Sequence, residues 1–294
     1  MANGLEVSNI PETTLLEQET TSARRIRRNG YFVVGSSIVV ILILLSILAP
    51  WISHINPNIT ELSAPLLPVG TPHHWLGTDQ LGRDQWTRVL YGGRTTLLSG
   101  ILASAISTFV GVIMGVIAGY SGWIVDTVIM RSMDILMSFP FILLAILIVA
   151  FWGPSTFHAL LAIAVANVPF FARLIRSEVL KVKELEFVTA SVAIGATQWR
   201  IIFRHVFPML VPYIISTLFM NVGFMISQTS ALSFLGFGTQ PPTAEWGAML
   251  AEAQTYLSVR PGVAIVPGIA IVIAVVGFNL LGLGLKQLLY SSHS

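Results

Sequence analysis

Uncharged apolar stretches long enough to cross a lipid bilayer recur along the whole chain. They are Tyr31–Ala49, Leu97–Gly119, Ile135–Ala172, Val206–Ala244 and Pro261–Leu285. A transmembrane helix needs about 20 consecutive apolar residues, so each stretch is long enough for at least one span. Inside lipid, only helices and closed barrels satisfy all their own backbone hydrogen bonds. The uncharged stretches therefore predict an all-α integral membrane protein.

The same stretches set the expected number of spans. Ile135–Ala172 is interrupted by Trp152-Gly-Pro-Ser155, which predicts two spans joined by a tight turn. Val206–Ala244 holds one span, Met209–Phe234, followed by an apolar re-entrant or surface loop rich in Gly and Pro. The expected total is six spans. Charged residues make up 10% of the chain, against about a quarter in globular domains.

Basic residues indicate the orientation, since loops on the cytoplasmic side carry an excess of Lys and Arg. With the N-terminus inside, twelve of the 16 Lys and Arg residues fall on the inner face: Arg24, Arg25, Arg27, Arg28, Arg131, Arg173, Arg176, Lys181, Lys183, Arg200, Arg204 and Lys286. The other four, Arg83, Arg88, Arg94 and Arg260, fall outside. Both termini are therefore expected in the cytoplasm.

This orientation divides the chain into segments. Residues 1–30 are expected to be a disordered cytoplasmic tail that ends in a basic cluster, and residues 31–50 form the first span. Residues 51–96 are an extracytoplasmic loop with an irregular, Pro-punctuated first half. Its second half, Asp84–Leu97, has the periodicity of a helix lying in the membrane interface. Residues 97–289 form the remaining spans and include a cytoplasmic loop, 178–208.

The cytoplasmic loop 178–208 is too charged to enter lipid. Five ionisable residues lie between Glu178 and Glu186, and each would cost about 2.5–3.5 kcal/mol at a bilayer centre. Periodicity predicts two amphipathic helices joined at Gly195, where a helix end favours positive φ. Their expected apolar faces are Leu185, Val188 and Val192 in the first helix, and Trp199, Ile202, Phe203 and Val206 in the second. The loop is either a docking element for a soluble partner or a connector resting on lipid headgroups.

The outer loop carries alternating charges next to two glycines. Asp79, Arg83, Asp84 and Arg88 follow Trp75 and are interleaved with Gly77 and Gly82. This pattern predicts internal ion pairs that hold a compact loop, or contacts with a soluble protein outside. His73 and His74 are adjacent, so they point in different directions on regular backbone, and no metal site is expected.

Polar residues are rare inside the predicted spans. Asn221 and Gln228 lie seven residues apart and share a helix face, which nominates the fifth span for a transport pathway. Such residues also hold helices together, and Gly111, Gly115 and Gly119 predict a close helix contact. Arg131 and Asp134 have the spacing of a helical ion pair.

Several function classes lack their required residues. An ion-coupled carrier is expected to hold ionisable groups near the midplane, and no span contains Asp, Glu, Lys or Arg. Motifs for an intramembrane hydrolase are absent, as is the Gly-x-x-x-x-Gly-Lys-Ser/Thr loop that binds nucleotide phosphates. Any energy input must then arrive through a protein contact, for which the cytoplasmic loop offers a surface.

Two motifs resemble a known family. Thr189-Ala190-Ser191, then Gly195 and Pro208, resemble the EAA loop of ABC-importer permeases, which docks on the ATPase. Thr189 replaces the family's Glu, a departure for which Glu186 could compensate, and Arg200 and Arg204 lie in the same loop.

A second motif is more specific. The segment His74–Asp84, with its continuation to Gly100, and Ser233–Gly238 resemble the second permease chain of oligopeptide, dipeptide and nickel importers. The resemblance covers about Tyr31 to Leu285.

The resemblance implies an ABC type I importer permease fold working by alternating access in a bacterial or archaeal cell membrane. It implies a homologous second permease, two cytoplasmic ATP-binding subunits that bind ATP and Mg, and an extracytoplasmic substrate-binding protein. This chain is then expected to be non-catalytic, to bind no cofactor and to contact lipid but no nucleic acid. The expected cargo is a di- or oligopeptide, with nickel or a metal chelate as the alternative.

Overall fold

The computed structural model describes residues 29–290, and within that range it is helical, with no extended strand. The predicted tail, apart from Asn29 and Gly30, and the basic cluster Arg24–Arg28 lie outside the described residues. The helices are α2 Gly30–Ile47, α3 Ala49–Ile52, α4 Gln85–Tyr120, α5 Trp123–Met137, α6 Phe141–Trp152, α7 Thr156–Lys183, α8 Glu186–Ala193, α9 Gln198–Ile201, the π-helical turn η1 Ile202–Val206, α10 Phe207–Phe234, α11 Trp246–Ala253, the 3₁₀ turn η2 Gln254–Tyr256 and α12 Gly262–Tyr290.

Five stretches of helix in the described range are individually long and apolar enough to span a membrane: α2, α4, α7, the continuous stretch Gln198–Phe234 and α12. A sixth span is present if α5 and α6 are counted together, although their axes are bent by 88°. The expected six spans agree with the structure if this bent pair is one span, which then begins at Trp123 and not at Ile135 as expected. Pro140 has no amide hydrogen and restricts Phe139 before it, so the helix ends ahead of it and restarts in a new direction.

The predicted interfacial helix Asp84–Leu97 is not a separate element. It forms the first turns of α4, which runs unbroken from Gln85 to Tyr120 and is capped by Asp84, whose side chain accepts from the Thr87 amide. Gly92 and Gly93 do not break this helix. A Cβ at either position would lie 3.1 Å from the Trp246 ring, so their missing side chains make room for α11.

The glycines of the second span form the predicted close contact. A Cβ on Gly111 would lie 2.3 Å from Phe171 Cβ, and one on Gly115 would lie 2.7 Å from the Ala172 carbonyl oxygen. The α4 and α7 backbones can therefore approach within the space that side chains would otherwise fill. Phe171 itself is fully buried in this contact.

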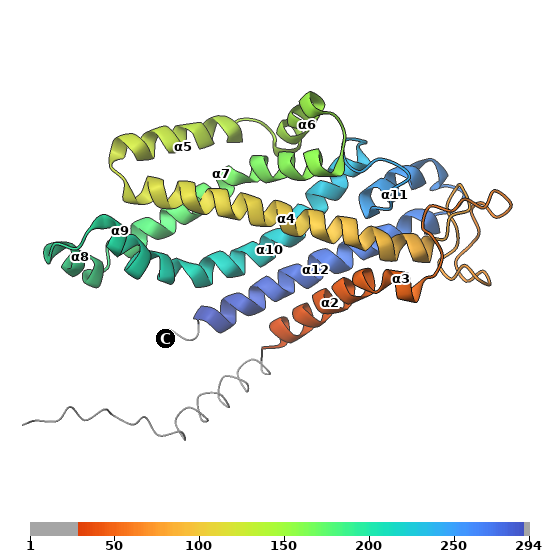
Figure 1. The fold of residues 1–294 in the computed structure, drawn as a ribbon, viewed down its shortest axis with the longest axis horizontal. Helices are drawn as coiled ribbons and strands as arrows, with labels where there is room; N and C mark the ends of the chain where they lie inside the picture. Colours follow the sequence, from red (N-terminus) through yellow and green to blue (C-terminus); the bar gives the residue numbers. More distant parts are fainter. Residues whose placement is uncertain (1–28, 291–294) are drawn as a thin grey trace, which may run out of the picture.

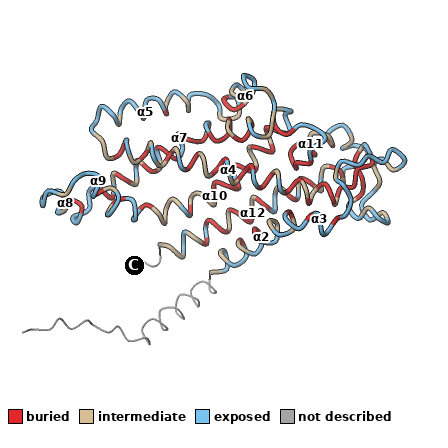
Figure 2. The backbone as a smooth tube through the Cα atoms, in the orientation of Figure 1, coloured by how far each residue is buried: buried red, intermediate tan, exposed pale blue. Residues whose placement is uncertain are grey.

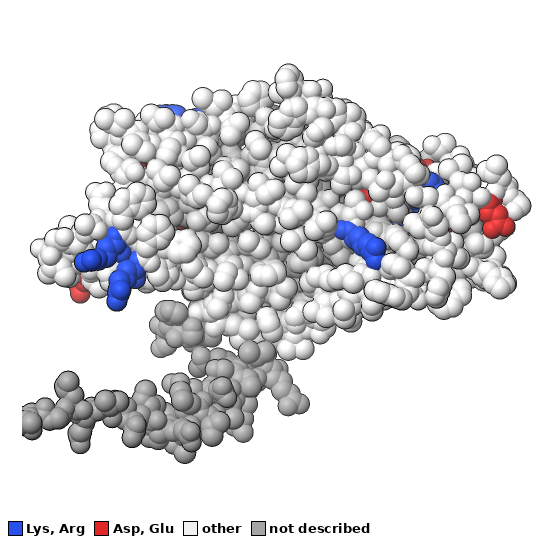
Figure 3. All heavy atoms as spheres, in the orientation of Figure 1, with Lys and Arg blue, Asp and Glu red and all other residues white. Residues whose placement is uncertain are grey.

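The long helices run along the longest axis of the molecule (Figure 1). The hairpin α8–α9 and the C-terminal end of α12 lie at one end, and the loop between α3 and α4 lies at the other. Buried residues follow α4, α7, α10 and α11, whereas α5 is largely exposed (Figure 2). Charged side chains on the face shown in Figure 3 are few and lie toward its two ends. An uncharged belt between charged ends is the pattern expected of a membrane protein.

Candidate functional site

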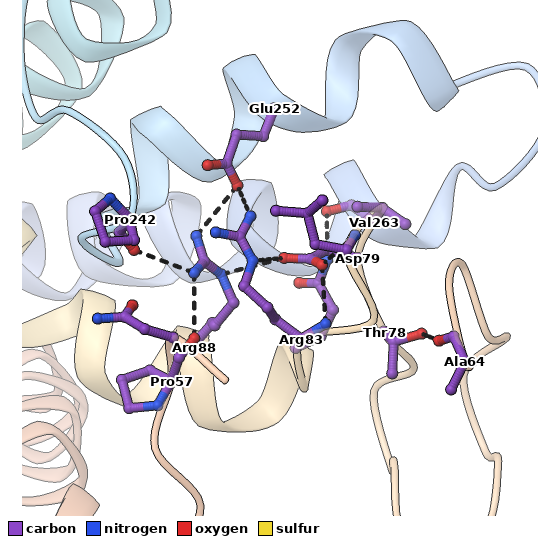
Figure 4. Close-up of polar contacts among 12 residues, drawn as sticks. Pro57, Ala64, Thr78, Asp79, Arg83, Arg88, Pro242, Glu252 and Val263 are labelled. Atoms are coloured by element: carbon purple, nitrogen blue, oxygen red, sulfur yellow. Dashed lines mark hydrogen bonds and ion pairs between the residues drawn. The ribbon is translucent and has the colours of Figure 1, made fainter. Parts of the chain in front are cut away.

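Four charged residues meet at the loop end of the molecule and form an outer ion cluster: Asp79, Arg83, Arg88 and Glu252 (Figure 4). Asp79 Oδ2 lies 2.6 Å from Arg83 Nε and 3.4 Å from Arg88 Nε. Glu252 Oε2 lies 2.5 Å from Arg83 Nη2 and 3.1 Å from Arg88 Nη2. Arg83 and Arg88 are almost fully buried, so two carboxylates balance two guanidinium groups away from water.

The outer ion cluster connects three parts of the chain. Asp79 and Arg83 belong to the loop, Arg88 to α4 and Glu252 to α11. Arg88 Nη1 also donates to the carbonyl oxygens of Pro57 and Pro242, at 3.2 and 3.4 Å. The cluster therefore fastens the outer loop to the segment that joins α10 and α12.

A second set of contacts fixes the start of α4. Asp84 Oδ2 accepts from the Thr87 amide at 2.8 Å, and Asp84 Oδ1 lies 3.0 Å from His74 Nδ1. The Thr87 hydroxyl is 2.6 Å from the Ser53 hydroxyl, which anchors the end of α3. Gly82 has φ +75°, and a Cβ there would lie 1.9 Å from the Glu61 carbonyl oxygen. The turn before α4 thus requires glycine.

The outer-loop residues expected from sequence fall into two groups. Asp79, Arg83, Asp84 and Arg88 are buried and internally paired, and Gly77 and Gly82 are buried at positive φ. Internal pairing therefore describes the charged residues better than direct contact with a protein outside. Trp75 differs, since 70% of it is exposed.

The hairpin α8–α9 projects from the opposite end of the molecule (Figure 1). Gly195 joins the two helices at φ +81° with no atom near its missing Cβ, as the predicted glycine hinge requires. The remaining expected residues of the loop, Glu186, Thr189, Ala190, Arg200, Arg204 and Pro208, are all exposed. Pro208 lies in the first turn of α10, directly after the π-helical turn with which α10 is continuous.

The apolar faces predicted for the hairpin are partly wrong. Val188 and Val206 are buried against α7, but Leu185 and Val192 are exposed. Trp199 and Phe203 stack on each other, with ring centroids 5.9 Å apart, and are 70% and 65% exposed. Ile201 takes the buried position instead. The π-helical turn accounts for the error in the second segment only, because its wider turn puts Ile201, five residues before Val206, on the buried face.

Two ion pairs tie α5 to α7 near the hairpin. Arg176 donates to Asp126 through Nε and Nη2, and Nη2 lies 2.6 Å from Asp126 Oδ2. Arg173 pairs with Asp134, which also lies 3.6 Å from Arg131 as the helical spacing predicted. Because α7 leads directly into α8, these pairs connect the hairpin to α5 and to its bend at Pro140.

A cavity of about 800 Å³ lies between the α5–α6 bend and helices α7, α10 and α12. Its lining is mostly apolar and aromatic: Leu136, Met137, Phe139, Pro140, Phe141, Leu144, Ala166, Asn167, Phe170, Leu174, Tyr213, Thr217, Met220, Asn221, Phe224, Asn279 and Lys286. Asn221, nominated from sequence, lines the cavity. Gln228 does not, because the cavity ends one turn before it.

Three residues important to these sites were not foreseen. Asn167 lines the cavity, and Glu252 completes the outer ion cluster. Glu245 is 3% exposed and caps α11, accepting from the Gly247 and Ala248 amides at 2.9 and 2.8 Å and from the Thr96 hydroxyl at 3.0 Å. Burial raises the pKa of this carboxyl, while its hydrogen bonds oppose the change. The only signal in the sequence was an acidic residue ahead of a short apolar run.

Comparison with known proteins decides the family. Residues 111–292 match the family described as "Binding-protein-dependent transport system inner membrane component". This chain belongs to that family. Residues 21–68 of the permease match a second model, "N-terminal TM domain of oligopeptide transport permease C". The chain is thus an inner-membrane component of a binding-protein-dependent transport system.

Individual relatives of this permease resemble it over most of both chains. It is 39% identical to a probable D,D-dipeptide transport permease, DdpC, of Escherichia coli (strain K12), over 84% of this chain and 82% of the relative. It is 41% identical to the dipeptide transport permease DppC of Alkalihalophilus pseudofirmus, over 84% and 81%. It is 44% identical to the glutathione transport permease GsiD of Pectobacterium atrosepticum, over 74% and 72%.

A solved structure shares the fold of this permease. It is described as an inward-facing conformation of the MetNI methionine ABC transporter and matches with a TM-score of 0.58. The match has 17% sequence identity and covers 76% of this permease and 99% of that chain. The expected ABC-importer permease fold is confirmed.

Proposed function

We propose that this permease forms half of the translocation pathway of an ATP-driven importer of di- or oligopeptides. The observation that carries the proposal is its likeness, over most of its length, to permeases named for dipeptide, D,D-dipeptide and glutathione transport. None of these three is named for nickel, so the metal alternative is not favoured.

The hairpin α8–α9 is the proposed contact with one of two cytoplasmic ATP-binding subunits, which would bind ATP and Mg. It exposes an apolar tip, Ile194 at 85%, beside the stacked Trp199 and Phe203. Arg200 and Arg204 are exposed on the same segment. Exposed aromatic and Arg side chains are favoured in protein interfaces, which supports docking rather than a passive connector. Placing the hairpin in the cytoplasm follows from the distribution of basic residues.

Movement of the hairpin would change the shape of the cavity. Helix α8 follows α7, and Arg173 and Arg176 tie α7 to α5, whose C-terminal residues line the cavity. Closure of the ATP-binding subunits would therefore rotate α7 and α5 together. The cavity would then open alternately to the two sides of the membrane. A homologous second permease would close the opposite wall, and an extracytoplasmic binding protein would deliver cargo at the outer loop, where Trp75 is exposed.

The test uses the assembled transporter, purified through a tag on this chain and reconstituted in vesicles. Wild type is expected to co-purify with a second permease and ATP-binding subunits and to take up a labelled dipeptide on addition of ATP and binding protein. Gly195→Val should lower uptake per ATP hydrolysed, because a β-branched residue is strained at φ +81°. Gly195→Asn is the matched control, since asparagine tolerates this conformation. Sustained dipeptide flux through this chain alone would refute the proposal.

A further inference from the structure

Three asparagine side chains lie in the wall of an otherwise apolar cavity. Asn167 is on α7, Asn221 on α10 and Asn279 on α12, and all three line the cavity of about 800 Å³. Lys286 is the one charged side chain among the lining residues, and it is exposed. Neutral amides from three different helices thus provide most of the hydrogen-bonding capacity that this wall offers.

The first two amides are held by a layer of hydroxyl groups on α4. Asn167 Nδ2 donates to Asn221 Oδ1 and to the Ser107 hydroxyl, both at 3.3 Å. Asn221 Nδ2 donates to the Ser104 hydroxyl at 3.2 Å, and that hydroxyl donates to the Leu218 carbonyl oxygen. Asn167 and Asn221 are 4% and 7% exposed. Burial and these bonds fix the orientation of both amides.

The fixed orientation leaves one acceptor and one donor unused. Each side-chain amide has two N–H donors and one carbonyl acceptor. Asn167 uses both donors, and its Oδ1 accepts no hydrogen bond from the described residues. Asn221 uses its acceptor and one donor, so one N–H is left. Asn167 Oδ1 is not among the fully buried side-chain atoms that lack a partner, so it keeps access to the cavity, where a ligand can reach it.

A peptide group is the chemical complement of these two atoms. Its N–H can donate to Asn167 Oδ1, and its C=O can accept from Asn221 Nδ2. Beside these two neutral amides a charged group would lose its hydration without gaining a counter-charge, since Lys286, the one charged lining residue, is exposed. The aromatic and Met side chains around the amides, including Phe170, Phe224 and Met220, suit apolar side chains of varied shape.

We infer that Asn167 and Asn221 form a subsite that binds a backbone peptide group of the cargo during its passage, with Asn279 as an additional polar contact. The inference rests on the proposed peptide transport and adds a recognition step within this permease. The subsite binds the backbone of the cargo peptide and not its side chains, so it accepts peptides of different sequence.

The experiment compares a dipeptide with its ester analogue, in which oxygen replaces the amide N–H. Uptake by the reconstituted transporter with its binding protein is measured for two substrates. One is the best-transported member of a dipeptide panel, and the other is the matching ester. The ratio of the two uptake rates is measured for wild type and Asn167→Leu. Because the binding protein is the same in both, a change in the ratio reports on the permease alone. Ser216→Ala is the matched control, a buried polar residue on α10 outside the cavity lining.

The preference for the amide is expected to fall about two- to tenfold in Asn167→Leu, the size of one hydrogen bond, and to stay unchanged in Ser216→Ala. A purely structural role for Asn167 would lower both uptake rates alike. If Asn167→Leu does not fold, Asn279→Leu serves instead, since Asn279 donates only within its own helix, to the Val275 carbonyl oxygen.

Two outcomes would overturn the inference, and they differ in whether they also contradict the proposed function. If Asn167→Leu keeps the wild-type preference for the amide over the ester, the asparagines do not form this subsite, and the proposed peptide transport still stands. A wild-type transporter that takes up no dipeptide of the panel would contradict the proposed function as well.

Discussion

Arg83 and Glu252 form an ion pair between the outer loop and α11, with Nη2 and Oε2 2.5 Å apart. The loop precedes the second span, whereas α11 lies between α10 and α12. The same carboxylate also binds Arg88 on α4, so one side chain joins three segments of the outer end. The outer loop is therefore part of the folded bundle and not an appendage.

Removing Glu252 should destabilise the outer end strongly. In Glu252→Ala, Arg83 and Arg88 stay buried with Asp79 as the one remaining carboxylate of the cluster. Breaking a buried ion pair by removing one partner costs about 3–5 kcal/mol. The measurement is thermal unfolding of the purified protein in detergent. Glu61→Ala, at an exposed position in the same loop, is the control, and an equal effect of both changes would contradict a structural role for the cluster.

The turn at Gly82 should tolerate no side chain. Gly82 and Gly70 both have positive φ, at +75° and +89°, so alanine is strained at either position. They differ in their surroundings, because a Cβ at Gly82 would lie 1.9 Å from the Glu61 carbonyl oxygen and one at Gly70 meets no atom. Gly82→Ala is therefore expected to lower the melting temperature much more than Gly70→Ala. Similar melting temperatures for the two variants would show that the loop shifts at Gly82 to make room for the added Cβ.

The Asp126–Arg176 pair should be energetically coupled. It is partly exposed, with 22% and 31% of the two side chains accessible, so a modest coupling energy of about 1 kcal/mol is expected. A double-mutant cycle with Asp126→Ala and Arg176→Ala measures it by thermal unfolding. The exchanged pair, Asp126→Arg with Arg176→Asp, should recover part of the stability lost in either single reversal. Strictly additive effects of the alanine changes would mean that the Asp126–Arg176 pair contributes nothing to holding α5 against α7.

Sequence patterns predicted the membrane spans well because their signal is local. An uncharged apolar run must be helical in lipid, whichever residues it later packs against. The glycines at 111, 115 and 119 and the hinge at Gly195 were also foreseen, since each reflects a backbone requirement of a single position. The bend between α5 and α6 could have been read from Pro140, but the apolar run continues across it and concealed the break.

The candidate sites were harder to predict because their partners are distant in sequence. Asp79 and Arg83 were assigned internal pairing, yet Glu252 is separated from them by most of the bundle. Asn221 was nominated from its own helix, while Asn167, which holds it, lies on α7. The wrong face of the second hairpin segment had a different cause, since a π-helical turn shifts the register that periodicity assumes.

The buried carboxyl of Glu245 should make stability depend on pH. Burial raises its pKa above the ordinary value of 4.5, so between 4.5 and the raised pKa the folded protein keeps a proton that the unfolded chain has released. The free energy of unfolding therefore falls as pH rises through this window, then levels once the folded carboxyl is ionised. Glu245→Gln removes this component and keeps an acceptor for the α11 cap.

Melting temperatures of wild type and Glu245→Gln should be compared at a series of pH values starting below 4.5. The wild type is expected to lose stability relative to the variant as pH rises, because only the wild type must bury an ionising group. Glu61→Gln, at an exposed site, provides a control that should show no such trend. A difference that stays constant, or that changes in favour of the wild type with rising pH, would mean that the hydrogen bonds from Gly247, Ala248 and Thr96 outweigh the effect of burial.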